Sequence, residues 1–310
     1  MNNKIKKYRQ EITEQVIKAL EQGTAPWQRP WSGECFPRNA VSKRHYSGAN
    51  TIVLSMKGLM LDGGADPRWL TFRQAAAKGW NIRKGEHGTN ISFWKNIYAP
   101  VEDIAGNPIL DSNGNPVMKD IFMEKLFTVF HASQIEGIPP YIPTVISEIE
   151  ANEKAEKILS ASGAEIRHGG CRAFYRYSED FIQLPPKETF TSDEGYYSTA
   201  LHELSHWTGH ESRLNRDMSG IKGSPAYARE ELVAELGAMF LSAETDIQQT
   251  QEHFDNHAAY VDSWISLLKG DPNVLFKAAA DANKATEFLL RKEHDRGKVA
   301  LEPDIEEGAA

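Results

Sequence analysis

Two histidines that stand four positions apart are the residues best placed to do chemistry, in the run His202-Glu203-Leu204-Ser205-His206. This spacing puts both imidazoles on one face of a helix, and imidazole nitrogens bind zinc at about 2.0–2.1 Å. Glu203 lies one position round from the first histidine, so its carboxylate can reach a water at the metal without binding the ion. It can then take a proton as that water attacks a carbonyl, and pass it to the leaving amine. The pattern therefore predicts a Zn²⁺ site with His202 and His206 as ligands and Glu203 as the catalytic base.

A catalytic zinc also needs a third protein ligand and an open position. Ser212 stands where the extended motif HExxHxxGxxH has a third histidine, so that form is excluded. A Glu-rich run follows 24 to 29 positions after His206. On one face of this run, we assign Glu231 to the metal and Glu235 to a hydrogen bond with the free N–H of a ligand histidine. His210 is the alternative third ligand, although the glycine before it should end the helix.

Two other parts of a peptide-cleaving site stay open at the level of sequence. The candidates for stabilising an oxyanion are Tyr196, Arg229 and Tyr260, and nothing selects among them. The segment Tyr177–Leu184 is expected to be extended, beside the metal helix. It could pair with an extended peptide substrate, or it could be an ordinary core strand.

The net charge of −8 conceals an uneven distribution along the chain. Residues 1–98 contain 16 Lys and Arg against 7 Asp and Glu, whereas the rest contains 19 against 36. Aromatic side chains lie among the basic ones, and stacking aromatics beside a cationic groove are typical of single-stranded nucleic-acid sites. The residues expected to contact single-stranded DNA are Trp27, Arg29, Trp31, Arg38, Lys43, Arg44, Tyr46, Arg73, Arg83, Lys84 and Lys95.

Hydrophobic periodicity and turn residues predict an α+β protein of two domains. The first, residues 1–131, combines helices with strands and an intervening turn-rich excursion. The second, residues 151–292, is mainly helical with a small sheet. The expected helices cover 4–22, 49–61, 71–78, 148–162, 193–208, 226–243, 252–269 and 273–291. The expected strands cover 89–94, 125–130, 172–177 and 180–184. A proline-rich linker, 132–150, joins the domains, and a polar tail, 293–310, is expected to be mobile.

Composition narrows the class of protein further. Of 310 residues, 40% are hydrophobic, which is typical of globular proteins, and no apolar run is long enough to span a membrane. The basic N-terminus leads into an amphipathic segment rather than a secretory signal. Cys35 and Cys171 form no metal or redox motif, so we expect two free thiols in a reducing cytoplasm.

Several segments resemble the ArdC-type antirestriction proteins of conjugative plasmids, whose N-terminal domain is shared with plasmid TraC-type primases. The resemblance covers about residues 5–300 and rests on the segments "GTAPWQRPW", "PRNAVSKRHYSGAN", "PRWLTFRQA", "IRKGEHGTNISFWK", "YYSTALHELSHWTGH" and "YAREELVAELGAMF".

This resemblance implies an N-terminal domain that binds single-stranded DNA and a C-terminal zincin-like metallopeptidase that acts on proteins near DNA. It also implies protection of incoming plasmid DNA from restriction. In the gluzincin variant of the zincin pattern, the ligand glutamate and the acidic residue four positions later match Glu231 and Glu235. The family pattern has Asp at the second of these positions. Two alternatives remain: a DNA-coating protein with a vestigial or structural metal site, and, more weakly supported, a metal-dependent nuclease.

Overall fold

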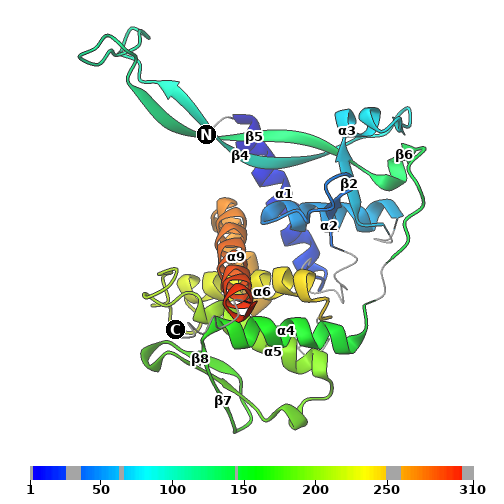
Figure 1. The fold of residues 1–310 in the computed structure, drawn as a ribbon, viewed down its shortest axis with the longest axis vertical. Coiled ribbons are helices and arrows are strands. Elements are labelled where there is room, and N and C mark those ends of the chain that lie inside the picture. The colour runs from blue at the N-terminus through cyan, green and yellow to red at the C-terminus, as the bar shows by residue number, and fades with distance from the viewer. Residues whose placement is uncertain (1–2, 26–35, 63–65, 144–145, 249–259, 302–310) are drawn as a thin grey trace, which may run out of the picture.

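The chain folds as α+β, with most of its strands in the N-terminal half and most of its helices in the C-terminal half (Figure 1). The computed structural model describes residues 3–25, 36–62, 66–143, 146–248 and 260–301. Among these, no helix combines the length and the apolarity that a membrane crossing requires. Cys35 lies outside the described residues, and Cys171 is an exposed free thiol.

A four-stranded sheet with the order β1-β2-β5-β4 organises the N-terminal half. β1 and β2 pair in parallel, and the other neighbours are antiparallel. Buried Leu54 and Trp69 pack against one another beneath the sheet, together with Ile91 and Val129. The elements are α1 (Asn3–Glu21), β1 (Arg38–Asn39), α2 (Ala49–Asp62), β2 (Arg68–Thr71), α3 (Phe72–Ala77), β3 (Asn81–Ile82), β4 (Thr89–Pro100), β5 (Met118–His131) and β6 (Ile135–Glu136). The three helices expected in this half are confirmed, and Thr71 caps α3 through a capping box.

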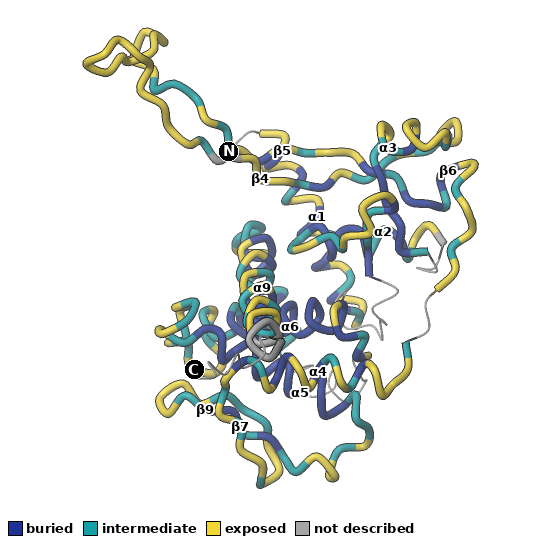
Figure 2. Tube along the Cα trace, in the orientation of Figure 1, coloured by how far each residue is buried: buried dark blue, intermediate teal, exposed yellow. Residues whose placement is uncertain are grey.

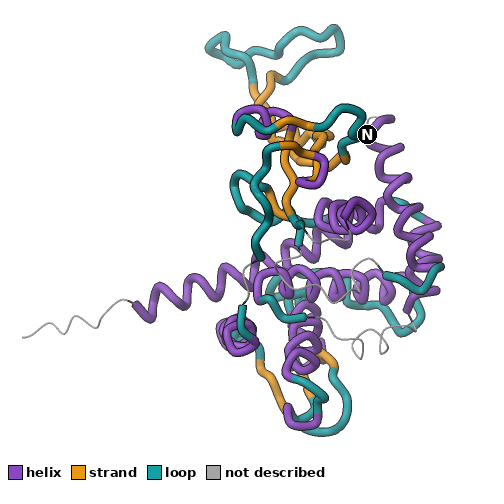
Figure 3. The backbone as a smooth tube through the Cα atoms, turned by 90° about the vertical axis from the view of Figure 1, so that its right-hand side faces the viewer, coloured by secondary structure: helices purple, strands orange, loops and turns teal. Residues whose placement is uncertain are grey.

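The β4–β5 hairpin is far longer than the two strands expected from the sequence. It pairs continuously from Thr89↔Val129 to Pro100↔Met118 and projects away from the rest of the molecule (Figures 1 and 3). The turn-rich excursion forms its tip, where Asp103 and Asp111 each accept hydrogen bonds from two backbone N–H groups. The outer parts of the strands were missed because their side chains have no buried face and so no clear alternation of apolar and polar residues.

The C-terminal half is a set of helices with a small three-stranded sheet, as expected. The sheet has the order β7-β9-β8. The elements are α4 (Glu148–Ser162), β7 (Glu165–His168), β8 (Phe174–Arg176), β9 (Phe181–Leu184), α5 (Asp193–Trp207), α6 (Pro225–Thr245), α8 (Val261–Gly270) and α9 (Asn273–Leu301). β7 was not predicted, because Ile166 is the only apolar residue in this strand. The expected helix 252–269 falls partly on residues 249–259, which lie outside the described residues.

Two boundaries differ from the expectations. The segment 132–150, expected to be a linker, begins with a 3-10 helix, Ala132–Gln134, and continues into β6, where Ile135 is buried. Asp271 accepts the backbone N–H of Asn273 at the start of α9. However, α9 continues to Leu301 instead of giving way to a tail at 293. Lys, Arg, Glu, Ala and Leu all favour helix, so this polar segment extends the helix without needing a buried face.

One hydrophobic core joins the two halves. The apolar face of α1 packs against α8 and α9, so that the ring centroids of Tyr8 and Phe276 lie 6.0 Å apart. The Thr13 hydroxyl donates to the carbonyl of Pro272 at 2.9 Å. Buried segments of the trace therefore continue from the helical bundle into the sheet-bearing half (Figure 2). The residue limits of the two domains stay a prediction.

Candidate metal centre

Two neighbouring helices, α5 and α6, carry the residues singled out for metal chemistry. Ser192 caps α5 by accepting the Gly195 N–H, and Ser224 caps α6 with Pro225 at its first position. The helices approach closely at Gly237 in α6. A Cβ at that position would stand 2.6 Å from the hydroxyl oxygen of Ser205 in α5, which is closer than real Cβ contacts come. The missing side chain thus lets α6 bring its glutamates to the histidines of α5.

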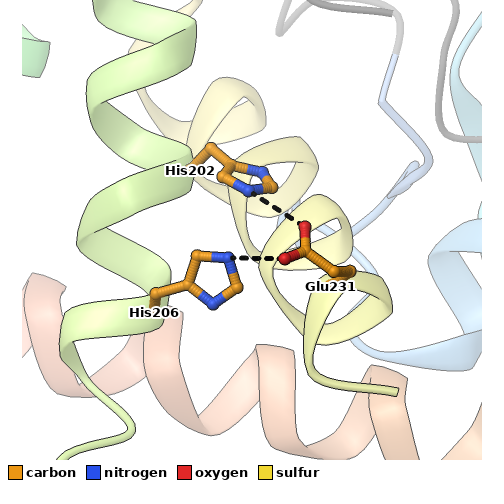
Figure 4. Close-up of side chains that lie close together, drawn as sticks. All are labelled: His202, His206 and Glu231. Atoms are coloured by element: carbon orange, nitrogen blue, oxygen red, sulfur yellow. Dashed lines mark ion pairs between the residues drawn. The ribbon is translucent and has the colours of Figure 1, made fainter. Parts of the chain in front are cut away.

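The two histidines and Glu231 converge on one buried point (Figure 4). His202 Nε2 lies 3.8 Å from Glu231 Oε2, and His206 Nε2 lies 3.8 Å from Glu231 Oε1. One ligand atom from each residue lies within 4.8 Å of the others. Ligands held at about 2.1 Å from a tetrahedral ion are about 3.4 Å apart. A small inward movement of the three side chains is therefore enough to enclose a divalent ion.

Carboxylates from α6 also lie behind both histidines. Glu235 Oε1 lies 3.4 Å from His202 Nδ1, the contact predicted for it, and this carboxylate is fully buried. Glu230 Oε1 lies 3.2 Å from His206 Nδ1, a contact that sequence reasoning missed. Each carboxylate can fix its imidazole with Nε2 toward the shared point. The sequence did offer one signal for this role of Glu230, because it directly precedes the predicted ligand Glu231 in the same helix.

Arg216 holds Glu230 in place from the loop that follows α5. Its guanidinium donates to both carboxylate oxygens of Glu230, at 3.0 and 2.7 Å, and to the Thr208 hydroxyl and the Ser205 carbonyl. Such bidentate contacts fix a carboxylate in orientation as well as in position. This series of contacts, from Arg216 to Glu230 and from Glu230 to His206, therefore connects the loop to the metal centre.

The electrostatic character of the centre is strongly negative. Burial lowers the pKa of the His206 imidazole, but the hydrogen bond with Glu230 and the charges of Glu231, Glu230 and Glu203 outweigh it and raise the pKa to about 9. For Glu230 itself, burial raises the pKa, yet the bonds from His206 and Arg216 hold it below its ordinary value. A site that favours a proton on a buried imidazole favours a positive charge, which is what a metal ion brings.

Glu203 lies beside this point at the floor of an open cleft. The cleft has a volume of about 530 Å³, and His202, His206 and Glu231 also line it. Glu203 is 8% exposed, so its carboxylate is within reach of a water or peptide that enters the cleft. The position fits a base that acts on a molecule at the metal rather than a fourth ligand.

Two tyrosines form part of the cleft wall. Tyr260, one of the three oxyanion candidates, lines the cleft, and its hydroxyl lies 3.1 Å from that of Tyr227, which sequence reasoning missed. Burial raises the pKa of both phenols, so both remain protonated donors at neutral pH. The other candidates are engaged elsewhere: Arg229 pairs with Asp281 at 2.5 Å, and Tyr196 packs against the ring of His168.

Of the two possibilities left open for Tyr177–Leu184, the structure supports the ordinary core strand. Phe181–Leu184 forms β9, which is hydrogen-bonded to β7 on one side and to β8 on the other. β8 stands at the edge of the sheet, and Phe174 and Tyr175 line the cleft. An extended peptide could therefore pair only with β8 on this side. The alternative ligand His210 also lies outside the metal cluster among the described residues, with its ring against Tyr177.

The residues expected to contact DNA fall into three groups. Trp27, Arg29 and Trp31 lie outside the described residues. Arg38 and Tyr46 are half-buried, and Arg38 donates to the hydroxyl of Tyr141.

The third group consists of basic side chains on the surface. Arg83 is exposed but bonded to Glu86, at 2.9 Å, and to the carbonyl of Ser133. The other exposed basic residues of the set are Lys43, Arg44, Arg73, Lys84 and Lys95. Lys43, Arg44 and Lys84 lie in loops, Arg73 lies in α3 and Lys95 lies in β4. Their role in DNA binding stays a prediction.

Comparison with known proteins assigns each half of the chain to a known family. Residues 6–130 match the model of the N-terminal domain of the anti-restriction factor ArdC, and residues 153–281 match a zincin-like metallopeptidase model. The metal-free crystal structure of the antirestriction ArdC protein from plasmid R388 is 34% identical, covers 93% of this chain and 98% of that one, and superposes with a TM-score of 0.74. The chain belongs to the ArdC-type antirestriction family.

Other relatives agree with this membership. The Mn(II)-bound structure of the R388 ArdC protein is 33% identical, with a TM-score of 0.70 over 92% of this chain and 97% of that one. A DNA primase TraC of Escherichia coli is 46% identical over 92% of this chain, which spans only 27% of the primase. The uncharacterised protein y4eC of Sinorhizobium fredii is 34% identical over 92% of both chains. The C-terminal half of this ArdC-type protein is thus a zincin-like domain.

Proposed function

We propose that this protein binds single-stranded DNA through its N-terminal half and hydrolyses peptide bonds in proteins on or near that DNA through its zincin-like half. Acting in the cytoplasm, it protects plasmid DNA that enters during conjugation. The observation that carries the proposal is the convergence of His202, His206 and Glu231 beside Glu203 at the floor of an open cleft. The family's antirestriction role gives the cleft its context.

Two imidazoles and one carboxylate form a donor set that suits zinc. The related R388 protein has been crystallised with Mn(II), so the divalent ion in the cell is part of the proposal. Such an ion supplies Lewis acidity: it polarises a carbonyl and lowers the pKa of water. Glu230 and Glu235 support the donor set by holding each Nδ1 away from the ion.

Residues of the protein carry out proton transfer, stabilisation of the oxyanion and binding of the substrate backbone. Glu203 takes the proton from the attacking water and delivers it to the nitrogen of the leaving amine. The hydroxyls of Tyr260 and Tyr227, across the cleft, donate hydrogen bonds to the oxygen on which negative charge develops. The edge of β8 holds the substrate backbone in an extended form, antiparallel or parallel to Phe174–Arg176.

Glu203→Gln tests the catalytic part of the proposal. This change removes the base and keeps the three ligands, so metal content should stay at the wild-type level. Cleavage of a fluorescent casein by the metal-loaded full chain, with single-stranded DNA present, should fall about 10²–10⁴-fold. Equal cleavage by wild type and variant would contradict the assignment of Glu203.

A DNA-coating protein is the second candidate, because the N-terminal half matches a family model of its own. Protection of transferred DNA in a conjugation assay separates the two. Full protection by Glu203→Gln would mean that coating, rather than proteolysis, protects the DNA. Loss of protection together with retained DNA binding would support the peptidase.

A further inference from the structure

The projecting β4–β5 hairpin has one face that no function assigned so far uses. We define its outer face as the exposed side chains that share one side of the two strands: Phe93, Lys95, Lys119, Met123, Lys125 and Phe127. Register places Phe93 opposite Lys125, Lys95 opposite Met123, and Lys119 opposite Ala99. Side chains alternate between the two faces of a strand, so these six belong together.

Charge is sorted between the two faces of the hairpin. The paired stretch from Ile91↔Phe127 to Ala99↔Lys119 carries three lysines and no carboxylate on the outer face. Both acidic residues of the stretch, Asp120 and Glu124, fall on the opposite face. Glu124 is buried there and pairs with Arg9 of α1 at 2.6 Å. At its base, the outer face also includes buried Ile91 and Val129, which pack with Leu54 and Trp69. Beyond this base, the charged residues of the outer face in the stretch are all lysines.

Aromatic rings accompany the lysines. Phe93 and Phe127 lie edge to face with ring centroids 5.6 Å apart, although they are 45% and 43% exposed. The two rings form one contiguous apolar patch, and exposed patches of this kind mark interaction sites. The hairpin is exposed at its tip and exposed or intermediate along its outer strands (Figure 2), and its outer part stands clear of the helices in both views (Figures 1 and 3).

We infer that the outer face is a stacking platform along which single-stranded DNA lies, with bases on Phe93 and Phe127 and phosphates beside Lys95, Lys119 and Lys125. This inference rests on the proposed function and locates its DNA site. The seven residues from Lys119 to Lys125 span about 20 Å of strand, which is enough for several nucleotides. Only Lys95 of this set was expected from the sequence to contact DNA.

The chemistry of the face favours a single strand over other occupants. A duplex stacks its bases on one another, whereas an unpaired strand can offer its bases to exposed aromatic rings. An acidic protein surface would use the lysines but would leave the two rings without a matching partner. Binding of duplex and single strand with equal affinity would therefore contradict the inference.

Two sets of substitutions in the full chain test the platform, with fluorescence anisotropy of a labelled oligo(dT) as the measurement. Phe93→Ala with Phe127→Ala removes the rings and should weaken binding at least about fivefold, since stacking is worth about 1–3 kcal/mol per base. The matched control is Trp94→Ala, because Trp94 is the next residue, is 63% exposed and lies on the opposite face. Its affinity should stay within about twofold of wild type.

The second set replaces Lys95, Lys119 and Lys125 with Gln. The slope of log affinity against log salt should become shallower by about two, because each phosphate contact on a single strand contributes about 0.7. A control with the same change in net charge replaces exposed lysines of the C-terminal half, Lys157, Lys277 and Lys284, and should keep the wild-type slope.

The outcomes separate this inference from the function on which it rests. If wild type fails to bind oligo(dT) at low salt, both the DNA-binding function and the platform fail. If wild type binds and the variants of the outer face bind equally well, the outer face is not the DNA site, and the DNA-binding function stands. Equal loss in Trp94→Ala and in the double phenylalanine variant overturns the assignment to one face. Unchanged thermal midpoints show that the variants are folded.

Discussion

Glu230 and Glu235 decide which nitrogen of each histidine faces the shared point. An imidazole has two nitrogens, and only a partner on one of them fixes the other as a ligand. His202 Nδ1 faces Glu235, and His206 Nδ1 faces Glu230, so both Nε2 atoms point toward Glu231. The five side chains therefore act as one unit.

Substitution of the glutamates should rank their roles. Glu231→Ala removes a ligand and should abolish stoichiometric metal binding. Glu235→Ala leaves the ligands in place and should lower the metal affinity by about 10–100-fold. Isothermal titration with Zn²⁺ measures both. Glu244→Ala, in the same helix but 40% exposed, is the control and should bind like wild type. A larger loss for Glu235→Ala than for Glu231→Ala would contradict the ranking.

Protonation of His206 should make the stability of the metal-free protein depend on pH. The pKa in the folded chain, about 9, lies above the ordinary value of 6.5. The stabilisation is therefore complete below about pH 6.5 and is lost as the pH rises toward 9. The thermal midpoint of EDTA-treated protein should fall across this interval, and Glu230→Gln should move the fall to lower pH. A midpoint that stays level in wild type would refute the prediction.

At the scale of elements, the contact between α5 and α6 sets the geometry of the centre. Gly237→Ala should improve helix propensity by about 1 kcal/mol, but its Cβ would meet Ser205 at 2.6 Å and push the helices apart. We expect metal affinity to fall at least about tenfold, since small ligand displacements are costly, and Ser205→Gly to restore part of it. Gly195→Ala is the control, because its Cβ would have no neighbour closer than 3.6 Å. Unchanged affinity in Gly237→Ala would show that the close approach is dispensable.

The same scale explains what the sequence could predict. His202, Glu203 and His206 stand within one helical turn, so their spacing alone places them together. Glu231 needed a second helix, but its run of glutamates on an apolar helix was a usable signal. Because Glu235 lies four positions after Glu231, on the same helix face, the sequence favoured it over Glu230 as the carboxylate that orients a histidine. In the structure each of the two carboxylates contacts the Nδ1 atom of one histidine.

Other features have no local signal. The Tyr227–Tyr260 pair depends on how α6 meets α8, and the strand order β7-β9-β8 depends on a parallel pairing between distant segments. For this reason the sequence left open whether Tyr177–Leu184 is a free edge or a core strand. The length of the β4–β5 hairpin was missed because none of the described side chains beyond Glu124 is buried on either face.

For the whole molecule, the shared core predicts joint unfolding of the two halves. The buried residues of α1 that face α8 and α9 include Ile12, Val16 and Leu20. At about 1.5–3 kcal/mol for each buried side chain, exposing the face of α1 would cost on the order of 10 kcal/mol, which is comparable with the whole stability of a typical domain.

Calorimetry of the full chain should therefore show one unfolding transition rather than two. A fragment ending at residue 131, which keeps the whole N-terminal sheet, should be unfolded or aggregate, as judged by circular dichroism and gel filtration. A fragment with the full chain's thermal midpoint would contradict the prediction, as would two well-separated transitions in the intact protein.

The placement of α1 also sets the order of events during synthesis. Its partners in α8 and α9 leave the ribosome about 250 residues later, which takes roughly 12–50 s at about 5–20 residues per second. Throughout that interval, the first helix to be made carries an apolar stripe with nothing to cover it. The nascent chain therefore needs either a temporary cover, such as a chaperone, or a provisional hydrophobic contact that the final helices later displace.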